Sequence, residues 1–300
     1  MDGIHASFDY GYDPDTIEWC PIVVPPPAAR LPARATVDPA WLPPVGTQTT
    51  PSGFVWASIY GLATYKAAHT ARRAPSEPAL QASPFYPYIK ILEQFGAQPG
   101  ACTGGLISWC LDFLLANDGT PTLEQAPAPV PKPGHSDCQA AWRAYGGALL
   151  VSDYAFSIGS CGQVGITGKD GLDTLRGLIA RGLPLACGTS LHTDFPAYGR
   201  GGPVPYAGNG RILTRPDGRR AGQCLMILGY DDTLGAVLLR NSFGPGWGTE
   251  WAGSGGHMWM AYDTFQALAQ GSACFIHEIR PGSSTARAAA GRPGPRRRVG

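Results

Sequence analysis

The chain has 300 residues and a formal net charge of +1, so it can bury a substantial core and shows no charge excess that favours nucleic acid or a membrane surface. Its 41 glycines and 29 prolines favour loops and short strands over long helices. No apolar run is long enough to cross a bilayer, and residues 1–15 lack the basic-then-apolar order of a Sec signal peptide. We therefore expect a cytoplasmic protein, or one exported without such a signal.

The two ends of the chain differ in character from its middle. Residues 1–44 are proline-rich and predict an extended segment, of which residues 1–30 form an N-terminal strap across a surface. Residues 283–300 predict a disordered basic tail, which holds five arginines and no acid. Contact with nucleic acid is expected, if at all, only through this tail.

The first half of the chain predicts helices. Thr50-Pro51 is a typical helix start, and the residues after it are apolar on nearly every side, which indicates a buried central helix. Helical spacing also appears in 83–95 and 102–119, and a short helix is expected over 139–145 after a proline-rich connector at 120–134.

The second half predicts a mainly antiparallel sheet. A helix is expected over 170–181, ended by Gly182, and a long Gly/Pro-rich loop with a hairpin over 193–220. Strand patterns occur at 148–155, 183–191, 224–230, 236–240, 257–260 and 273–279. Helices followed by strands indicate an α+β fold, with one domain at 31–282 divided into a helical subdomain (about 45–145) and a β subdomain (about 146–282).

Eight cysteines allow disulfides, but their positions favour reduced thiols. Cys110 lies in a helical pattern, and Cys187, Cys224 and Cys274 lie in apolar strand patterns, where cysteine packs as a small core residue. No Cys/His spacing indicates zinc. We expect no metal and no cofactor.

Several strings in the sequence together resemble the papain-like (C1) cysteine peptidases, especially their compact bacterial members. The strongest is the segment 241–248, Asn-Ser-Phe-Gly-Pro-Gly-Trp-Gly, and Gly229-Tyr230-Asp231-Asp232 precedes it. Pro44-Val45-Gly46-Thr47-Gln48 resembles the lead-in to the family's oxyanion loop, and Gly104-Gly105 its Gly-Gly element. The resemblance covers roughly residues 30–282. It implies a helical half with a buried central helix, a β half, and a cleft between them.

The resemblance also implies a mechanism that needs four groups. A cysteine thiolate at the N-terminus of the buried helix attacks the substrate, and a histidine lowers its pKa and later protonates the leaving amine. An asparagine orients the histidine, and a glutamine helps to bind the oxyanion. Gln48 matches this glutamine and Asn241 matches this asparagine.

The other two groups have no counterpart in register. The cysteine position falls on Gly53, or on Phe54 or Val55 in other alignments, and none of these can attack a carbonyl. The histidine position falls on Gln223, and an amide cannot act as a base near pH 7. The remnant site is thus Gln48, Gly53, Gln223 and Asn241. We expect Asn241 to hydrogen-bond Gln223.

A rearranged active site is the alternative. Ser52 lies near the expected helix start, Cys102 and Cys161 are further thiols, and His192 follows a strand. A simpler interpretation is that Ser52 is a polar residue of the helix's first turn and that His192, beside Asp194, is a surface residue.

Three functions follow from these patterns. The favoured one is a catalytically inactive papain-like homologue that binds a peptide or protein in its cleft or through its termini. The second is an active cysteine or serine peptidase with a rearranged nucleophile. The third is a structural or cargo component of a larger assembly, docked through its termini. None of them requires a membrane.

Overall fold

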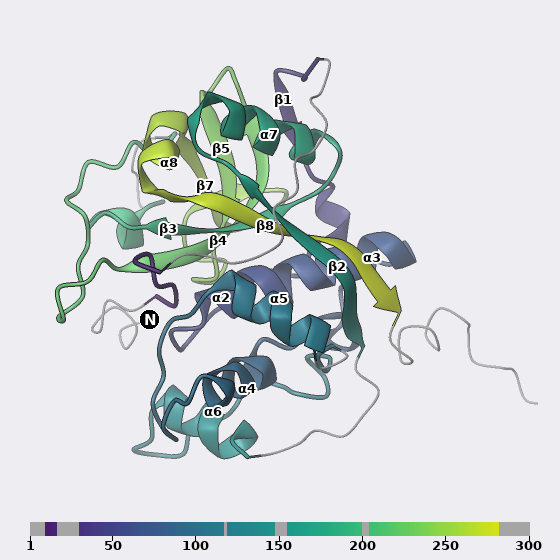
Figure 1. Ribbon diagram of the computed structural model, residues 1–300, viewed down its shortest axis with the longest axis vertical. Coiled ribbons are helices and arrows are strands. Elements are labelled where there is room, and N and C mark those ends of the chain that lie inside the picture. Colours follow the sequence, from purple (N-terminus) through teal and green to yellow (C-terminus); the bar gives the residue numbers. More distant parts are fainter. Residues whose placement is uncertain (1–9, 17–29, 117–118, 148–154, 200–203, 282–300) are drawn as a thin grey trace, which may run out of the picture.

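The computed structural model describes residues 10–16, 30–116, 119–147, 155–199 and 204–281. The basic tail and most of the N-terminal strap lie outside these residues. In Figure 1 a helical half lies below a sheet, and two further helices lie on the sheet's other side. None of the described helices combines the length and the apolar character needed to span a membrane.

The helical half is built around one long, nearly fully buried helical segment. It consists of a short α2 (Gly53–Val55), a π-helical stretch (Trp56–Ala63) and α3 (Thr64–Ala71). Every residue from Gly53 to Tyr65 is buried, as the apolar pattern predicts. Around it lie α4 (Phe85–Gln94), α5 (Ile107–Ala116) and α6 (Asp137–Tyr145), and short 3-10 turns occur at Pro39–Trp41 and Pro78–Leu80.

Two of the predicted helices in this half are confirmed, and one begins later than expected. The helices α4 and α6 lie where 83–95 and 139–145 predict them. The helix expected over 102–119 begins only at Ile107 and ends at Ala116, because Gly104 and Gly105 form an extended approach to it. A serine N-cap and Gln139 form a capping box at the start of α6.

Within the described residues, eight strands form one sheet. Its order is β2-β8-β3-β4-β5-β7-β6, and β1 pairs with β4. The strands are β1 (Arg34–Thr36), β2 (Phe156–Gly165), β3 (Leu185–Ser190), β4 (Gly222–Asp231), β5 (Ala236–Arg240), β6 (Thr249–Trp251), β7 (Ser254–Ala261) and β8 (Ala269–Pro281). All the pairs are antiparallel, which confirms the expected α+β class.

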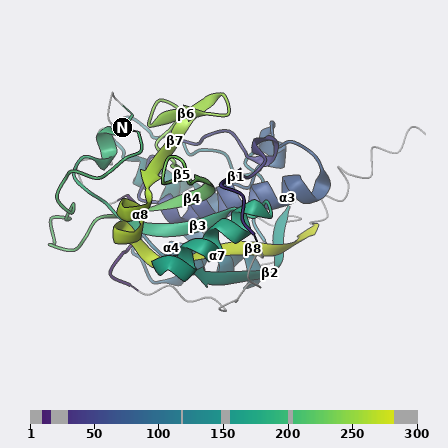
Figure 2. The same ribbon diagram turned by 90° about the horizontal axis from the view of Figure 1, so that it is seen from above.

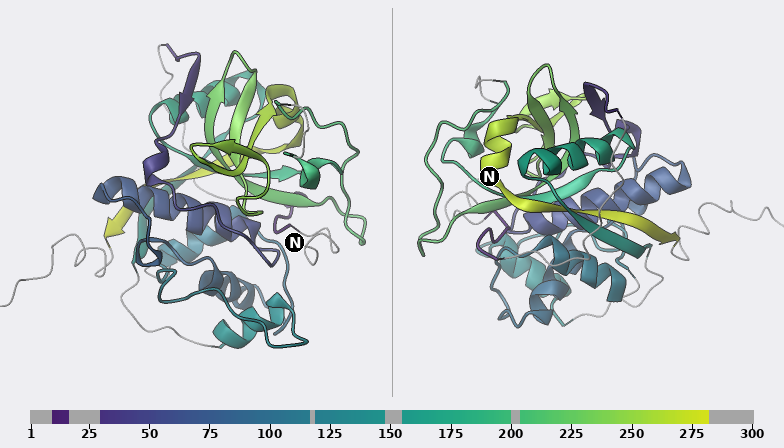
Figure 3. Two further views of the ribbon diagram at one scale, coloured as in Figure 1. Left: turned by 180° about the vertical axis from the view of Figure 1, so that it is seen from behind. Right: turned by 45° about the horizontal axis from the view of Figure 1, so that its top comes forward.

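Two helices cover the far side of this sheet. The amphipathic α7 (Gly168–Ala180) packs against β1, β2 and β4, and Gly182 follows it with the positive φ typical of a helix end. The short α8 (Tyr262–Leu268) connects β7 to β8. Figure 3 shows these helices and the central helix on opposite sides of the sheet, and Figure 2 shows α7 and α8 in front of the sheet when it is seen from above.

Some elements differ from the sequence pattern. The strand expected over 148–155 lies almost wholly outside the described residues, and the observed strand β2 begins at Phe156. The pattern did not indicate β6, α8 or the full length of β8. Strand β6 is held by its hairpin pairing with β7, and β8 is held by pairing with β2, which lies far away in the sequence.

Candidate functional site

The central helix begins at Gly53, later than the Thr50-Pro51 pair predicts. The Ser52 carbonyl accepts the first helical hydrogen bonds, from the N–H groups of Val55 and Trp56. The Ser52 hydroxyl does not cap the helix backbone, because it receives the Thr50 hydroxyl at 3.0 Å and the Trp56 indole N–H at 3.2 Å. Thr50 and Pro51 therefore belong to the turn that leads into the helix.

Four buried polar side chains meet next to this helix start. The Gln223 Nε2 group donates to Asn241 Oδ1 at 2.7 Å and to Gln48 Oε1 at 2.9 Å. The Ser242 hydroxyl also donates to Gln48 Oε1, at 2.5 Å, and the Ser242 N–H donates to Asn241 Oδ1. The expected hydrogen bond between Gln223 and Asn241 is thus confirmed. We call Gln48, Gln223, Asn241 and Ser242 the amide cluster.

Gly53 is the residue of the helix start that faces the amide cluster. A Cβ atom added to Gly53 would lie 2.1 Å from Gln223 Oε1. By contrast, Phe54 is fully buried, and its ring contacts those of Tyr88 and Trp109. Val55 is fully buried as well. Of the three positions that the sequence left open, Gly53 is the one opposite Gln223.

A segment of the chain's own N-terminal region, residues 10–16, occupies the seam between the two halves. Tyr12 forms β-bridges with Gly105, in the helical half, and with Gly222, at the start of β4. The Tyr10 carbonyl accepts a hydrogen bond from Gln48 Nε2 at 2.9 Å, and the Gly11 carbonyl accepts one from the N–H of Phe54 at 3.2 Å. In Figure 1 this short purple segment lies between β4 and α2.

Aromatic packing and arginines hold this segment in place. Tyr10 and Tyr12 are fully buried, and burial raises the pKa of Tyr10 to about 12. The Tyr12 ring lies against Gly188, where an added Cβ would be only 1.9 Å from it. The Arg215 Nη2 group donates to the Tyr12 carbonyl at 3.1 Å. A hydrogen-bonded ion pair with Arg220 lowers the pKa of Asp15.

Comparison with solved structures identifies this architecture. Three similar structures are xylellain, a cysteine protease from Xylella fastidiosa (TM-score 0.63, 19% identity), proCathepsin B S9 from Trypanosoma congolense (0.59, 14%) and digestive procathepsin L 3 from Tenebrio molitor larval midgut (0.55, 16%). The similarity to xylellain covers 91% of this chain and 97% of that protein. The corresponding shares are 92% and 88% for proCathepsin B S9, and 92% and 78% for procathepsin L 3. The fold is that of the papain-like cysteine proteases.

This likeness is one of fold, since the sequence identities are low. No family model matches the sequence, and no curated protein is significantly similar to it. Gln48, Gly53, Gln223 and Asn241 come together from three segments of the chain: the stretch 48–53, the start of β4 and the residue after β5.

The alternative catalytic residues are not brought together in the described part of the chain. The Ser52 hydroxyl contacts Thr50 and Trp56 and makes no hydrogen bond to a described histidine. The ring of His192 lies against Gly208, in the loop that precedes β4. Cys161 lies on β2, opposite Ile276 of β8.

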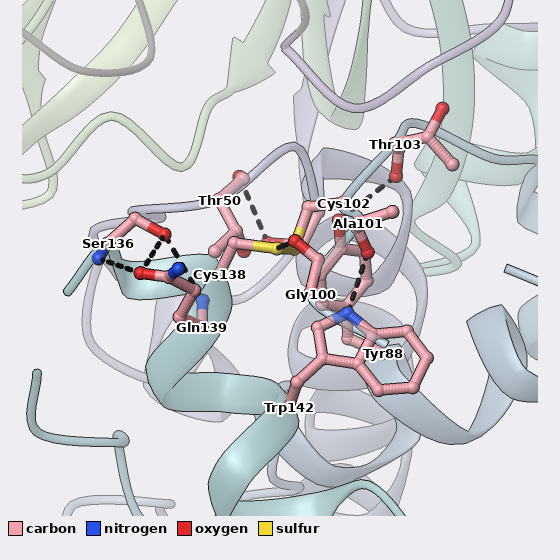
Figure 4. Close-up of a disulfide and its surroundings, with 11 residues drawn as sticks. Thr50, Tyr88, Gly100, Ala101, Cys102, Thr103, Ser136, Cys138, Gln139 and Trp142 are labelled. Atoms are coloured by element: carbon pink, nitrogen blue, oxygen red, sulfur yellow. Dashed lines mark hydrogen bonds between the residues drawn. A yellow bond between two sulfur atoms is a disulfide. The ribbon is translucent and has the colours of Figure 1, made fainter. Parts of the chain in front are cut away.

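Cys102 and Cys138 form a disulfide, so the expectation of reduced thiols is wrong for this pair. Their Cα atoms are 5.9 Å apart, and the bridge joins the approach to α5 to the first turn of α6 (Figure 4). The expectation drew on the core cysteines, whereas these two lie only half-buried beside loops. The core cysteines are buried thiols as expected: Cys110, Cys187, Cys224 and Cys274. Cys102 is thereby removed as a candidate nucleophile.

The amide cluster contains no ionisable side chain, and this limits its chemistry. Amides and a hydroxyl can donate and accept hydrogen bonds, but they cannot exchange protons near neutral pH. Among the described residues, no group of three or more His, Cys, Asp or Glu side chains is placed to hold a metal ion. One member of the cluster, Gln48, binds a backbone group of the chain itself, the Tyr10 carbonyl.

Gly53→Ala tests whether close packing holds residues 10–16 in the seam. The new Cβ would meet the Tyr10 carbonyl at 2.7 Å as well as Gln223, so we expect a loss of about 1–3 kcal/mol of folding stability. We also expect residues 10–16 to become cleavable by chymotrypsin after Tyr10 or Tyr12, which mass spectrometry would detect.

Gly246→Ala is the matched control for this change. Gly246 is exposed, and nothing lies within 4 Å of an added Cβ, so its replacement should alter stability by less than about 0.5 kcal/mol. Equal stability and equal protection of residues 10–16 in both variants would contradict the close packing at Gly53.

Proposed function

We propose that this chain is a catalytically inactive member of the papain-like proteins, which binds an extended polypeptide and does not hydrolyse it. The observation that carries the proposal is the contact between Gly53 and Gln223. In a papain-like cysteine protease these two positions require a thiolate and an imidazole. Here one has no side chain and the other is a neutral amide.

The contacts of residues 10–16 support the binding role. The seam accepts an extended strand through backbone bridges at Gly105 and Gly222 and through the Gln48 side chain. In this structure the strand comes from the chain itself. A peptide or protein partner would replace residues 10–16 or use another surface. Of the terminal segments that the sequence suggests for docking, residues 10–16 and 30 are described, and the basic tail lies outside the described residues.

The Cys102–Cys138 disulfide bears on where this binding takes place. Disulfides persist in oxidising compartments and are rare in the cytosol. Of the two locations expected from the sequence, the pair favours the exported one.

An activity-based probe tests the proposal. We expect no covalent labelling of the full chain by an epoxide inhibitor of cysteine peptidases, and no turnover of a fluorogenic peptide library, under conditions in which papain is fully labelled. Stoichiometric labelling of one cysteine together with peptide turnover would overturn the proposal and establish a rearranged active site. Labelling without turnover would mark a reactive surface thiol, and mass spectrometry would show whether it lies in the seam.

A further inference from the structure

A pocket lies on the surface of the fold, separate from the buried amide cluster. It has a volume of about 420 Å³ and lies between the loop before Gln48, the loop after α3 and the β6–β7 hairpin. Its walls are mainly apolar and include Pro39, Leu42, Pro43, Val45 and Trp251. Two basic side chains, Arg240 and His257, also line it.

Arg240 is a buried cation that meets no carboxylate in the described residues. It is 6% exposed, and its Nη2 group donates to the Pro43 and Pro44 carbonyls at 2.7 and 2.5 Å. A guanidinium has five N–H donors, so Nε and Nη1 retain three that make no hydrogen bond to the described part of the chain. Burial lowers the pKa of Arg240 to about 10. Buried charges in proteins are ordinarily paired.

His257 lies beside Arg240 on the neighbouring strand. The two residues are register partners between β5 and β7, so their side chains leave the sheet on the same face. His257 is 2% exposed, and its Nδ1 lies 3.1 Å from the Ser254 carbonyl. Its Nε2 is buried and has no hydrogen-bond partner within the described ranges. With Nδ1–H donating to Ser254, Nε2 is an acceptor that lacks a donor.

We propose that this pocket binds a small-molecule carboxylate that has an aromatic or other apolar body and a hydroxyl next to the carboxylate. The carboxylate pairs with the free N–H groups of Arg240, and the hydroxyl donates to His257 Nε2. The apolar body packs on the prolines and Trp251. A single cation matches one negative charge, which favours a carboxylate over a phosphate dianion. The site is independent of the proposed function, because neither basic residue belongs to the amide cluster.

Isothermal titration of the full chain with three related probes tests the ligand class. Mandelate carries an aromatic ring, a carboxylate and an adjacent hydroxyl. Mandelamide lacks the charge, and phenylacetate lacks the hydroxyl. We expect mandelate to bind saturably, phenylacetate more weakly, and mandelamide at least about tenfold more weakly than mandelate. Absence of saturable mandelate binding up to about 10 mM, or equal binding of mandelamide, would overturn the proposal.

Variants place the binding in this pocket. Arg240→Met removes the buried charge with little change in volume and should abolish mandelate binding. Arg219→Met removes a mostly exposed arginine and should leave it unchanged. Because Arg240 also holds two loop carbonyls, a second variant leaves it intact: Ser76→Trp fills the pocket from its exposed rim and should weaken binding at least about tenfold. Unchanged affinity in the Ser76→Trp variant would show that mandelate binds elsewhere.

Discussion

Gln223→Glu should destabilise the folded protein by about 3–5 kcal/mol at pH 7, because it places a carboxylate among hydrogen-bond acceptors. Gln223 is fully buried. Its Nε2 group faces the side-chain oxygens of Gln48 and Asn241, and its Oε1 has no donor in the described part of the chain. Neither oxygen of a glutamate at this position would receive a hydrogen bond while the nearby Ser242 hydroxyl donates to Gln48. Rotating the Asn241 amide by 180° would offer its NH₂ group to the glutamate, but Asn241 Oδ1 would then lose the hydrogen bond that it accepts from the Ser242 N–H.

The loss of folding stability in Gln223→Glu should be smaller at acidic pH than at pH 7. Burial and the facing oxygens would raise the pKa of this glutamate above its unfolded value of about 4.3, since the protonated form can donate to one of the amide oxygens. A group whose pKa is raised by folding is tolerated below its unfolded pKa and costs stability as the pH rises through its folded pKa. The difference from the parent protein should therefore shrink between pH 7 and pH 4.

Urea unfolding across this pH range measures both effects. Gln98→Glu adds the same charge at an exposed position and should change stability by less than about 0.5 kcal/mol. If the unfolding free energy of Gln223→Glu equalled that of this control at pH 7, then Gln223 would not be enclosed by amide oxygens. The interpretation of the cluster as a closed, neutral site would then fail.

The meeting of Gln48, Gln223 and Asn241 was expected from the resemblance to the papain-like peptidases, and not from local pattern. Local pattern did indicate the α+β fold class, because helical spacing precedes strand patterns along the chain. The residue at which the central helix begins could not be predicted in this way, because the Ser52 hydroxyl is engaged by the side chains of Thr50 and Trp56 and does not cap the helix.

Contacts between distant segments could not be predicted in this way. The insertion of Tyr12 depends on the space left by Gly188, which lies far along the chain on β3. The tyrosine-glycine-tyrosine pattern of residues 10–12 was the only signal, and it fits a surface strap equally well. The Cys102–Cys138 pair likewise depends on a loop and the first turn of α6, which meet only in the folded chain. Local periodicity carries no information about such meetings.

The unfolding free energy should fall by about 3 kcal/mol as His257 becomes protonated in acid. Burial and then the positive charge of Arg240 lower the pKa of His257 to about 4, against about 6.5 in an unfolded chain. The unfolded state therefore binds this proton first, and the stabilising effect of the neutral imidazole is present above pH 6.5 and lost as the pH falls to 4. Arg240 is the charged group that acts on His257 among the described residues, and it does not titrate in this range.

His257→Gln removes this titrating group, so its stability should vary less steeply with pH between 7 and 4 than that of the parent protein. Urea unfolding at half-unit pH steps measures the two slopes, and carboxylates elsewhere contribute equally to both proteins. The matched control is His135→Gln, at an exposed position just after the proline-rich connector. A second arm uses Arg240→Met: without the neighbouring charge the pKa of His257 rises, and its transition moves to higher pH. Parallel slopes for His257→Gln and the parent protein would mean that His257 is not held neutral in the fold.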